Sequence, residues 1–539
     1  MAPIEVLVLS WNVGNKQPNA AELEAWLPAG GGSYDLVAVG TQENDFKEEK
    51  PGDEDEEDDD DRQVAETNVA AETRDVTLRH RQERLMAAKA ISKNESAWDA
   101  MVSERLGANY GVVAHQVMWQ MRLTLYAKSE HLGGPSLCID GVQAAQSATG
   151  LGGVLANKGG IVIKLDFGHT SLAFVSCHLA AHSHKLQRRN ADCQEVLEET
   201  RRGIGRPQVD VLHQFDHVFW LGDLNYRVDL NLVAPTTEDE HFASVSKLID
   251  ASDWKALMAA DQLRSCQAKG EAFAGFTEGQ CDFAPTFKVE RKDGMHYKNK
   301  RIPSYCDRIL WKSMPALKGH VEQKLLCSAP SVSTSDHKPV FAHFSITSSP
   351  AVRSAPEGAQ PPLIQLQHAS VDGVSATDKT YLVFLTNPDG LLGDAKQKPP
   401  RTMSVASRKS AASPSRLAAS WAAEQCPMLR PLVADPLDLA RTTLIVAVYD
   451  ADVLSEDDLL GTVLIPLARP DGPTAVSTDE EYELDVELPI VMGAVSADKG
   501  VFKAKLKVSY GGKLAPALEA AVGLHETEKL HSGGCCAVQ

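Results

Sequence analysis

Short apolar segments, separated by polar or helical stretches, recur throughout the first 346 residues and constrain the fold more than any other feature. Several are apolar at every position, which is typical of strands buried on both faces of a sheet. One long polar stretch between two of them, 182–204, has helical character. This alternation predicts an α/β (α+β) domain. The expected strands are 4–11, 34–43, 123–128, 159–167, 171–179, 217–223, 308–313 and 339–346.

Polar side chains stand where these expected strands end. A single one could be a turn former, but the repetition at corresponding ends predicts one crevice at the edge of a sheet. Oxygen ligands from a Glu and an Asn would suit Mg²⁺, and an Asp beside a His can orient or activate a water. The residues are Asn12, Glu43, His178, Asp223, Asn225, Asp336 and His337.

The chain of 539 residues is too long for one ordinary core, so more than one domain is expected. Ser, Pro and Ala become frequent after the first domain, 1–346, which predicts a linker over 347–375. Beyond it, short strand patterns with little helix predict a small all-β sandwich over 376–512, with a Ser-rich loop at 396–424. A polar tail follows, 513–539.

The net charge of −19 argues against nucleic-acid binding, because nucleic-acid-binding proteins usually carry a basic surface. Part of this charge lies in an unbroken acidic run, 53–61, inside a segment at about 45–74 that we expect to be a disordered surface loop. The sequence shows no apolar run long enough to span a bilayer and no signal-peptide pattern. The ten cysteines are therefore expected to stay reduced, without disulfides.

Two stretches, "FWLGDLNYR" (219–227) and "RIPSYCDRILW" (301–311), match the two signature motifs of the inositol polyphosphate 5-phosphatases. Further motifs of that family follow in the family's order: "WNVGN", "TQE", "NKGGIVIKL", "CHLAAH", "RNAD", "PTFK" and "SDHKPV". Over roughly residues 4–346 the chain thus resembles this family, which lies within the endonuclease/exonuclease/phosphatase superfamily. The resemblance implies a two-layer β-sandwich flanked by helices, with the site at one end.

The resemblance also implies roles for the residues that match the motifs. Asn12 and Glu43 would bind Mg²⁺. Asp223 would orient and deprotonate the attacking water, and Asn225 would help to position this water and the phosphate. No covalent phospho-enzyme is expected, because the sequence has no nucleophilic cysteine in a phosphate loop.

The remaining catalytic residues come from three other motifs. His178 resembles the family's phosphate-contacting histidine. Asp336 and His337 resemble the pair that completes the site, and Asp307 would support His337. Cys177 and Cys306 lie inside motifs as well, and we interpret both as buried packing residues.

Substrate preference is expected to depend on basic residues near the second signature. Lys288 and Arg301 match positions that hold the neighbouring 4-phosphate in the family. Tyr297, followed by Asn299 and Arg301, is closer to the branch that acts on soluble inositol phosphates, whereas Lys158 of "NKGG" resembles the lipid-acting branches. These two signals conflict, so the headgroup stays open. The other residues expected to contact substrate are Asn157, Arg189, Asn190 and Lys300.

The segment "LIVAVYDADVLSEDDLLGTVLIPL" (444–467) resembles the last hairpin of a C2-type sandwich. Asp450, Asp452 and Asp458 occupy its calcium-loop positions, and Asp389 and Asp394 are the candidates for a partner loop. Because many such sandwiches bind no Ca²⁺, the favoured interpretation is a sandwich that docks on membranes or supports the catalytic domain without calcium.

The final residues, "CAVQ", fit a CaaX prenylation pattern on Cys536, and the Gln favours a farnesyl group. One lipid chain anchors a protein only marginally, so a second signal is needed. Palmitoylation of Cys535 or contact of the sandwich with lipid would supply it. The sequence therefore predicts a cytoplasmic protein attached peripherally to the cytosolic face of membranes.

Together these features predict a Mg²⁺-dependent hydrolase that removes the 5-phosphate from inositol lipids or soluble inositol polyphosphates. The expected lipids are phosphatidylinositol 4,5-bisphosphate and 3,4,5-trisphosphate, and the soluble substrates are inositol 1,4,5-trisphosphate and 1,3,4,5-tetrakisphosphate. One alternative is another phosphodiesterase or nuclease of the superfamily, which the second signature and the acidic charge disfavour. The other is a non-catalytic phosphoinositide-binding scaffold, which the water-activating residues disfavour.

Overall fold

The computed structural model describes most of the chain outside the acidic segment and the tail. The described residues are 2–46, 96–133, 138–149, 157–232, 237–298, 301–352, 361–376, 379–392, 398–411, 413, 415–433, 436–451, 457–468, 481–496 and 499–509. Several predicted features lie outside them: the acidic run, Asn299, Lys300, Asp394, Asp452, Cys535 and Cys536.

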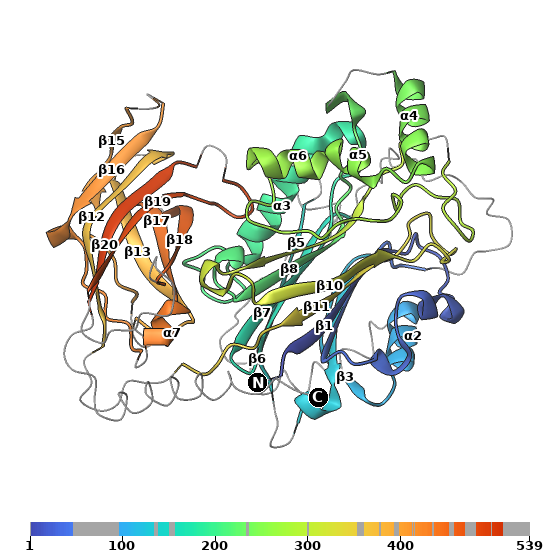
Figure 1. The fold of residues 1–539 in the computed structure, drawn as a ribbon, viewed down its shortest axis with the longest axis horizontal. Helices are drawn as coiled ribbons and strands as arrows, with labels where there is room; N and C mark the ends of the chain where they lie inside the picture. The colour runs from blue at the N-terminus through green and yellow to red at the C-terminus, as the bar shows by residue number, and fades with distance from the viewer. Residues whose placement is uncertain are drawn as a thin grey trace, which may run out of the picture.

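The described residues form two units, an N-terminal domain (2–352) and an all-β C-terminal sandwich (361–509) (Figure 1). In the N-terminal domain, two sheets run in the orders β10-β11-β1-β2-β4-β3 and β5-β6-β7-β8-β9. The first sheet contains β1 (Ile4–Asn12), β2 (Leu36–Gln42), β3 (Tyr110–Met118), β4 (Met121–Lys128), β10 (Val321–Ser328) and β11 (Val340–Ile346). The second contains β5 (Ile139–Ala148), β6 (Gly159–Phe167), β7 (Thr170–His178), β8 (His217–Asp223) and β9 (Asp307–Ser313).

The two sheets pack face to face, and their inner side chains form one buried cluster. Val6 and Val8 of the first sheet belong to it together with Ile161, Phe174 and Phe219 of the second. β1 and β8 are also buried at nearly every position, since helices cover the outer faces of the sheets. The sequence prediction of a two-layer α/β sandwich, with strands at all the expected segments, is confirmed.

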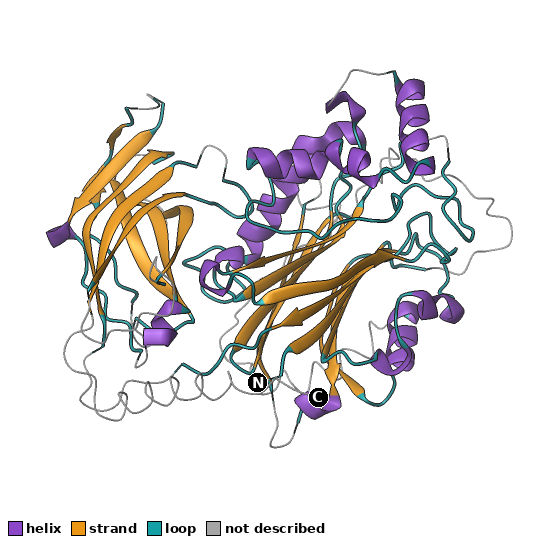
Figure 2. Ribbon diagram, viewed as in Figure 1, coloured by secondary structure: helices purple, strands orange, loops and turns teal. Residues whose placement is uncertain are grey.

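Helices flank both outer faces, as Figure 2 shows. The helix expected at 182–204 is α3 (Leu186–Thr200). The capping boxes of Ser96 and Thr237 start two further helices, and α6 ends at Gly270 in the left-handed conformation that glycine adopts without strain. No helix in the described part of the chain is long and apolar enough to cross a membrane. Besides α3, the α-helices described in this domain are α2 (Ala97–Leu106), α4 (Glu238–Asp250), α5 (Trp254–Ala259) and α6 (Gln262–Lys269).

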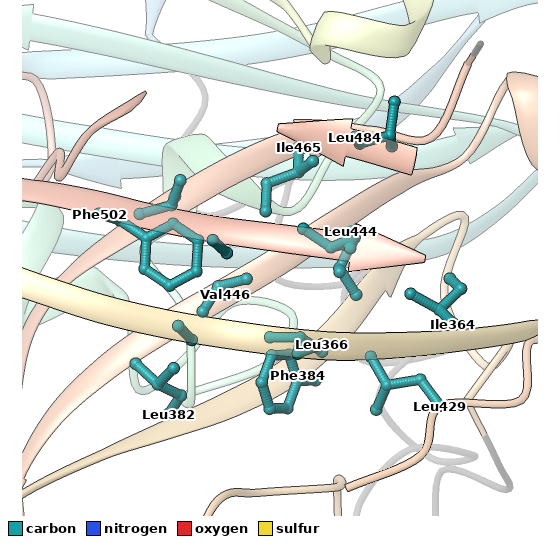
Figure 3. Close-up of a cluster of buried hydrophobic side chains, with 14 of the residues drawn as sticks. Ile364, Leu366, Leu382, Phe384, Leu429, Leu444, Val446, Ile465, Leu484 and Phe502 are labelled. Atoms are coloured by element: carbon teal, nitrogen blue, oxygen red, sulfur yellow. The ribbon is translucent and has the colours of Figure 1, made fainter. Parts of the chain in front are cut away.

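The C-terminal sandwich consists of two antiparallel sheets, in the orders β15-β16-β12-β20-β19 and β14-β13-β17-β18. Its core lies between them and includes Leu366, Phe384, Val446 and Phe502 (Figure 3). The strands are β12 (Leu363–Val374), β13 (Lys379–Asn387), β14 (Val405–Ala406), β15 (Arg408–Lys409), β16 (Leu417–Ala422), β17 (Thr443–Ala451), β18 (Asp458–Pro466), β19 (Tyr482–Pro489) and β20 (Val501–Ser509). A five-residue helix, α7 (Pro436–Ala440), precedes β17.

Two boundaries of the sequence prediction are wrong. The expected linker, 347–375, contains β12, a central strand whose alternating burial the surrounding Ser and Pro residues obscured. The expected Ser-rich loop, 396–424, contains the short strands β14 to β16: β14 and β15 have only two residues each, and β16 consists mostly of Ala and Ser.

The two units share a small hydrophobic cluster of their own. Val209, Met314 and Leu317 of the N-terminal domain pack against the outer face of β13, β17 and β18. Polar contacts surround it: Arg206 lies 2.7 Å from Asp389, and further hydrogen bonds cross the junction. The sandwich is therefore packed against the N-terminal domain through hydrophobic and polar contacts, in addition to its connection through the chain.

Candidate active site

The predicted polar residues converge because the sheet register aligns the strand ends. His178, Asp223 and Asp307 are cross-strand neighbours on β7, β8 and β9. Asn12 ends β1, and Glu43 directly follows the parallel neighbour β2. The convergence of polar residues expected from the sequence is therefore present, with residues from both sheets.

Asn12 connects the two sheets at this point. Its amide nitrogen donates to Oε1 of Glu43 at 2.9 Å and to Oδ2 of Asp223 at 3.1 Å, while its oxygen accepts from the backbone of Gly14. Glu43 adopts a positive φ of 50°, which few residues other than glycine adopt. In this conformation the Glu43 side chain contacts the amide of Asn12 and is one-third exposed.

Asp223 is buried among cationic and hydrogen-bonding groups. Its Oδ2 lies 3.3 Å from Nε2 of His178 and 3.8 Å from Nε2 of His337. Burial alone would raise the pKa of Asp223, but His337, His178 and Lys158 hold the pKa of this carboxyl well below its usual range. Asp223 is therefore a carboxylate at neutral pH and can accept a proton.

His337 is fixed by hydrogen bonds on its far side. Its Nδ1 lies 2.9 Å from Oδ2 of Asp307, which also accepts from the hydroxyl of Thr286 at 2.6 Å. Burial would lower the pKa of His337, but the carboxylates of Asp307 and Asp223 raise it to about 9. The predicted support of His337 by Asp307 is present, and the ring is an imidazolium at neutral pH.

Asp223, Asp307 and His337 lie close enough together to suggest a metal site. In this structure Nδ1 of His337 faces Oδ2 of Asp307 at 2.9 Å, so this nitrogen is engaged in a hydrogen bond. Glu43 and Asn12 fit a hard cation better, since they offer oxygen donors at the partly exposed edge of the crevice. The assignment of Mg²⁺ to Asn12 and Glu43 stays a prediction.

Lys158 lies at the core of the site. Its ammonium group is 2.6 Å from Nε2 of His178, the atom that also faces Asp223. Lys158, His178 and Asp223 therefore form one contiguous row of polar groups. Asn157 is exposed beside it.

Arg227 is a site residue that the sequence analysis missed. Its guanidinium donates to both oxygens of Asn225, side chain and backbone, and stacks over the ring of Phe287 at 4.5 Å. The ring of Phe287 in turn lies 4.5 Å from that of His337. Arg227 therefore orients the amide of Asn225, whose nitrogen donates to the carbonyl of Leu179. Its position at the end of the first signature motif is the sequence feature that could have identified it.

A second cationic group surrounds Asp336. Lys288 lies 3.2 Å from this carboxylate and Arg291 lies 4.0 Å away. Burial would raise the pKa of Asp336, but His337, Lys288 and Arg291 lower it. Lys288 is thus placed beside the site as predicted, while Arg291, which also reaches the carbonyl of Gly14, was missed. Arg301, ten residues after Arg291 in the sequence, is exposed.

The structure contradicts three predicted substrate contacts. Arg189 is fully buried and donates to three backbone carbonyls and to Gln262, so its charge is used inside the protein. Asn190 is buried between Cys266 and the hydroxyl of Tyr226. The hydroxyl of Tyr297 donates to the carbonyl of Pro285. These residues support the walls of the site and are not available to donate to a substrate.

The predicted calcium partner loop is also wrong. Asp450 pairs with Thr380 near the start of β13, whereas Asp389 follows the other end of that antiparallel strand. Strands rise about 3.3 Å per residue, which separates the two ends by roughly 25 Å. Asp389 binds Arg206 instead. Calcium binding by Asp450, Asp452 and Asp458 stays the less favoured alternative to a calcium-independent sandwich.

The described cysteines are free thiols. Cys177 and Cys306 are fully buried, and burial raises the pKa of both thiols well above the ordinary value. A thiol that stays protonated is a poor nucleophile, which agrees with the prediction that both are packing residues.

Comparison with known families gives a match to one family model. The model described as Endonuclease/Exonuclease/phosphatase family 2 matches residues 9–343, the span that contains every residue of the crevice and both sheets except the outer ends of β1 and β11. The chain belongs to this family. The expected superfamily is thereby confirmed.

Relatives of this family member carry names that agree with the motif resemblance. Phosphatidylinositol 3,4,5-trisphosphate 5-phosphatase 2B of Danio rerio is 29% identical over 479 residues, covering 83% of this chain and 33% of that protein. Type II inositol 1,4,5-trisphosphate 5-phosphatase of Mus musculus is 36% identical over 262 residues, covering 47% and 24%. The family member thus spans a third or less of the length of these relatives. The first match extends beyond the N-terminal domain into the sandwich.

Among solved structures, this family member is similar to the inositol polyphosphate 5-phosphatase domain of SPsynaptojanin, determined with inositol (1,4)-bisphosphate and a calcium ion. The two are 22% identical, with a TM-score of 0.46, and the match covers 64% of this chain and 84% of that one.

Proposed function

We propose that the protein is a Mg²⁺-dependent phosphatase that removes the 5-phosphate from inositol phosphates. Its substrates would be phosphatidylinositol 4,5-bisphosphate and 3,4,5-trisphosphate, soluble inositol 1,4,5-tris- and 1,3,4,5-tetrakisphosphate, or both groups. The observation that carries the proposal is the position of Asp223, a buried carboxylate between an imidazolium and the candidate metal ligands. The relatives named as 5-phosphatases support the same reaction class.

In this reaction Asp223 takes the proton of the attacking water. The neighbouring His337 imidazolium, held by Asp307, donates a hydrogen bond to the phosphoryl group and stabilises the charge that develops there. His178 and Lys158 place further positive or polar donors beside Asp223. Asn225, oriented by Arg227, fixes the position of the water. Each of these groups is held by the protein before substrate arrives, so little reorganisation is needed.

Magnesium would be held by Glu43 and Asn12, and when bound it would neutralise charge on the phosphate oxygens. The donor set suits it, because Mg²⁺ in proteins uses few carboxylates and keeps several waters. The amide nitrogen of Asn12 now faces both carboxylates, and rotation of the amide by half a turn would present its oxygen instead.

Glu43→Gln is expected to raise the Mg²⁺ concentration needed for half-maximal activity by about tenfold or more, because a neutral amide binds the cation less well. Titration of Mg²⁺ against phosphate release measures this, and the Mg²⁺-dependent shift in melting temperature gives a reading independent of turnover. Glu104→Gln, an exposed carboxylate on α2, is the matched control. An unchanged Mg²⁺ titration for Glu43→Gln would show that the metal binds elsewhere.

The substrate class can be tested by a direct comparison. Purified protein with Mg²⁺ is expected to release phosphate from inositol 1,4,5-trisphosphate, from phosphatidylinositol 4,5-bisphosphate in vesicles, or from both. Inositol 1,4-bisphosphate, which lacks the 5-phosphate, should release none. Binding of both substrates without turnover would favour the scaffold alternative, and cleavage of abasic DNA would favour a nuclease.

Membrane attachment extends this proposal. We propose that the C-terminal sandwich, the lipid-modified tail or both bring the enzyme to the cytosolic face of membranes. Prenylation of Cys536 and palmitoylation of Cys535 remain predictions, because residues 510–539 lie outside the described part of the chain.

A further inference from the structure

The turn between β3 and β4 exposes a large aromatic side chain. Met118 pairs with Met121 across the hairpin, so Trp119 and Gln120 form its two-residue tip. Both methionines are buried, whereas Trp119 is 68% exposed. Trp119 also adopts a positive φ of 54°, a conformation that glycine or asparagine adopts more readily.

This tip lies at the rim of the candidate active site. The carbonyl of Gln120 accepts from the backbone N–H of Asn44 at 2.9 Å, and Asn44 directly follows Glu43. Asn44 is also held by Arg122 of β4, whose guanidinium donates to the carbonyl of Asn44 at 2.6 Å. The hairpin tip is thus fixed to the loop that carries the candidate metal ligand.

The other side of the hairpin faces the segment that carries Lys158. The terminal methyl group of Met118 lies 2.8 Å from the point where a side chain at Gly159 would begin. Gly159 follows Lys158, whose ammonium group contacts His178. The hairpin that exposes Trp119 therefore contacts both the Glu43 loop, through Gln120, and the segment that follows Lys158, through Met118.

We infer that Trp119 inserts into the surface of a lipid bilayer containing anionic lipids and orients the active site toward it. Indole suits this environment, because its ring is apolar while its N–H can bond to headgroups and water. Lys158, on the segment that Met118 contacts, contributes positive charge at this end of the two sheets. The inference rests on the proposed function, for which a bilayer would present the lipid substrate.

A second copy of the chain is a poorer occupant for this surface. An exposed tryptophan offers roughly 150–250 Å² at most, whereas a stable interface buries about 800 Å² per partner. Among the described residues, the other large exposed apolar side chains are Val142, Leu325, Met403, Met428 and Leu432, and none belongs to this hairpin. Shallow insertion of one aromatic side chain into lipid requires no such area.

The test measures partition of the full chain onto phosphatidylcholine–phosphatidylserine vesicles without phosphoinositide. Trp119→Ala is expected to weaken partition about tenfold, and Trp119→Phe should retain most of it. Leu325→Ala, an exposed apolar residue on β10 at the opposite edge of the same sheet, should match the unmodified chain. Brominated lipid should quench tryptophan fluorescence of the unmodified chain more than that of Trp119→Phe.

Hydrolysis of soluble inositol 1,4,5-trisphosphate separates this inference from the proposed function. All three variants should keep that activity within about twofold of the unmodified chain, because none of them changes the crevice. Absence of vesicle binding by the unmodified chain, or equal binding and quenching for all variants, overturns the inference. A change in sedimentation coefficient on Trp119→Ala would assign the surface to a second copy. Failure of the unmodified chain to hydrolyse any inositol phosphate would defeat the proposed function, while vesicle partition would still report on Trp119.

Discussion

Asp223→Asn is expected to lower kcat for phosphate release by roughly three orders of magnitude. The carboxylate accepts hydrogen bonds from Asn12 and Asn225 and lies beside His178 and His337, so its pKa is held low and it is ionised at neutral pH. Asparagine keeps the shape of the side chain but cannot take a proton from water. Steady-state kinetics with the better of the two substrates measures the loss.

The matched control for this variant is Asp229→Asn, on the loop that follows the same strand. Asp229 is partly exposed and accepts from the backbone of Asn231, away from the crevice. It should change kcat by less than about twofold. Calorimetric titration of substrate into Asp223→Asn should show that binding survives. Retention of a tenth or more of the activity by a correctly folded Asp223→Asn protein would mean that another group activates the water.

Asp307→Asn is expected to shift the alkaline limb of the pH–activity profile to lower pH. In the unmodified protein Asp307 and Asp223 raise the pKa of His337 to about 9, so the imidazolium persists until the pH approaches that value. Removal of one carboxylate moves the pKa of His337 down toward its ordinary value, and the ring loses its proton earlier as the pH rises. At pH 8 kcat/KM should fall by roughly tenfold or more.

The acidic part of the pH–activity profile serves as the control for Asp307→Asn. Near pH 6 His337 is protonated in both proteins, so the difference between them should shrink there. Asp282→Asn, an exposed carboxylate in the segment before the second signature, should leave the profile unchanged. A loss of activity that is equal at pH 6 and pH 8 would contradict the assignment, since it would indicate a structural defect rather than a change in protonation.

The strands that the sequence predicted are mostly those buried on both faces. β1 and β8 read as continuous apolar runs because helices cover one side of each sheet and the partner sheet covers the other. The missed strands β3, β5 and β10 lie at sheet edges and are half-exposed, so polar residues are tolerated in them. A local pattern cannot detect a strand whose stability comes from one long-range neighbour.

The site residues likewise divide into those that a local sequence pattern can predict and those whose position depends on long-range packing. The residues at strand ends could be predicted, because the register of a sheet brings such ends together. Arg189 was assigned to substrate because a motif names residue types without showing where a side chain points. Its burial beneath backbone carbonyls depends on the packing of α3 against Gln262. Trp119 belongs to no motif, and its exposure is a property of the assembled hairpin alone.

The position of Asn12 makes catalytic competence an all-or-none property of the domain. Its single amide contacts Glu43 from its own sheet and Asp223 from the facing one. Separation of the two sheets would therefore break the contacts of Asn12 with Glu43 and Asp223 while the strands within each sheet are still paired. During gradual denaturation, loss of turnover should consequently precede loss of the β-sheet circular dichroism signal, so that activity serves as a sensitive reporter of packing between the layers.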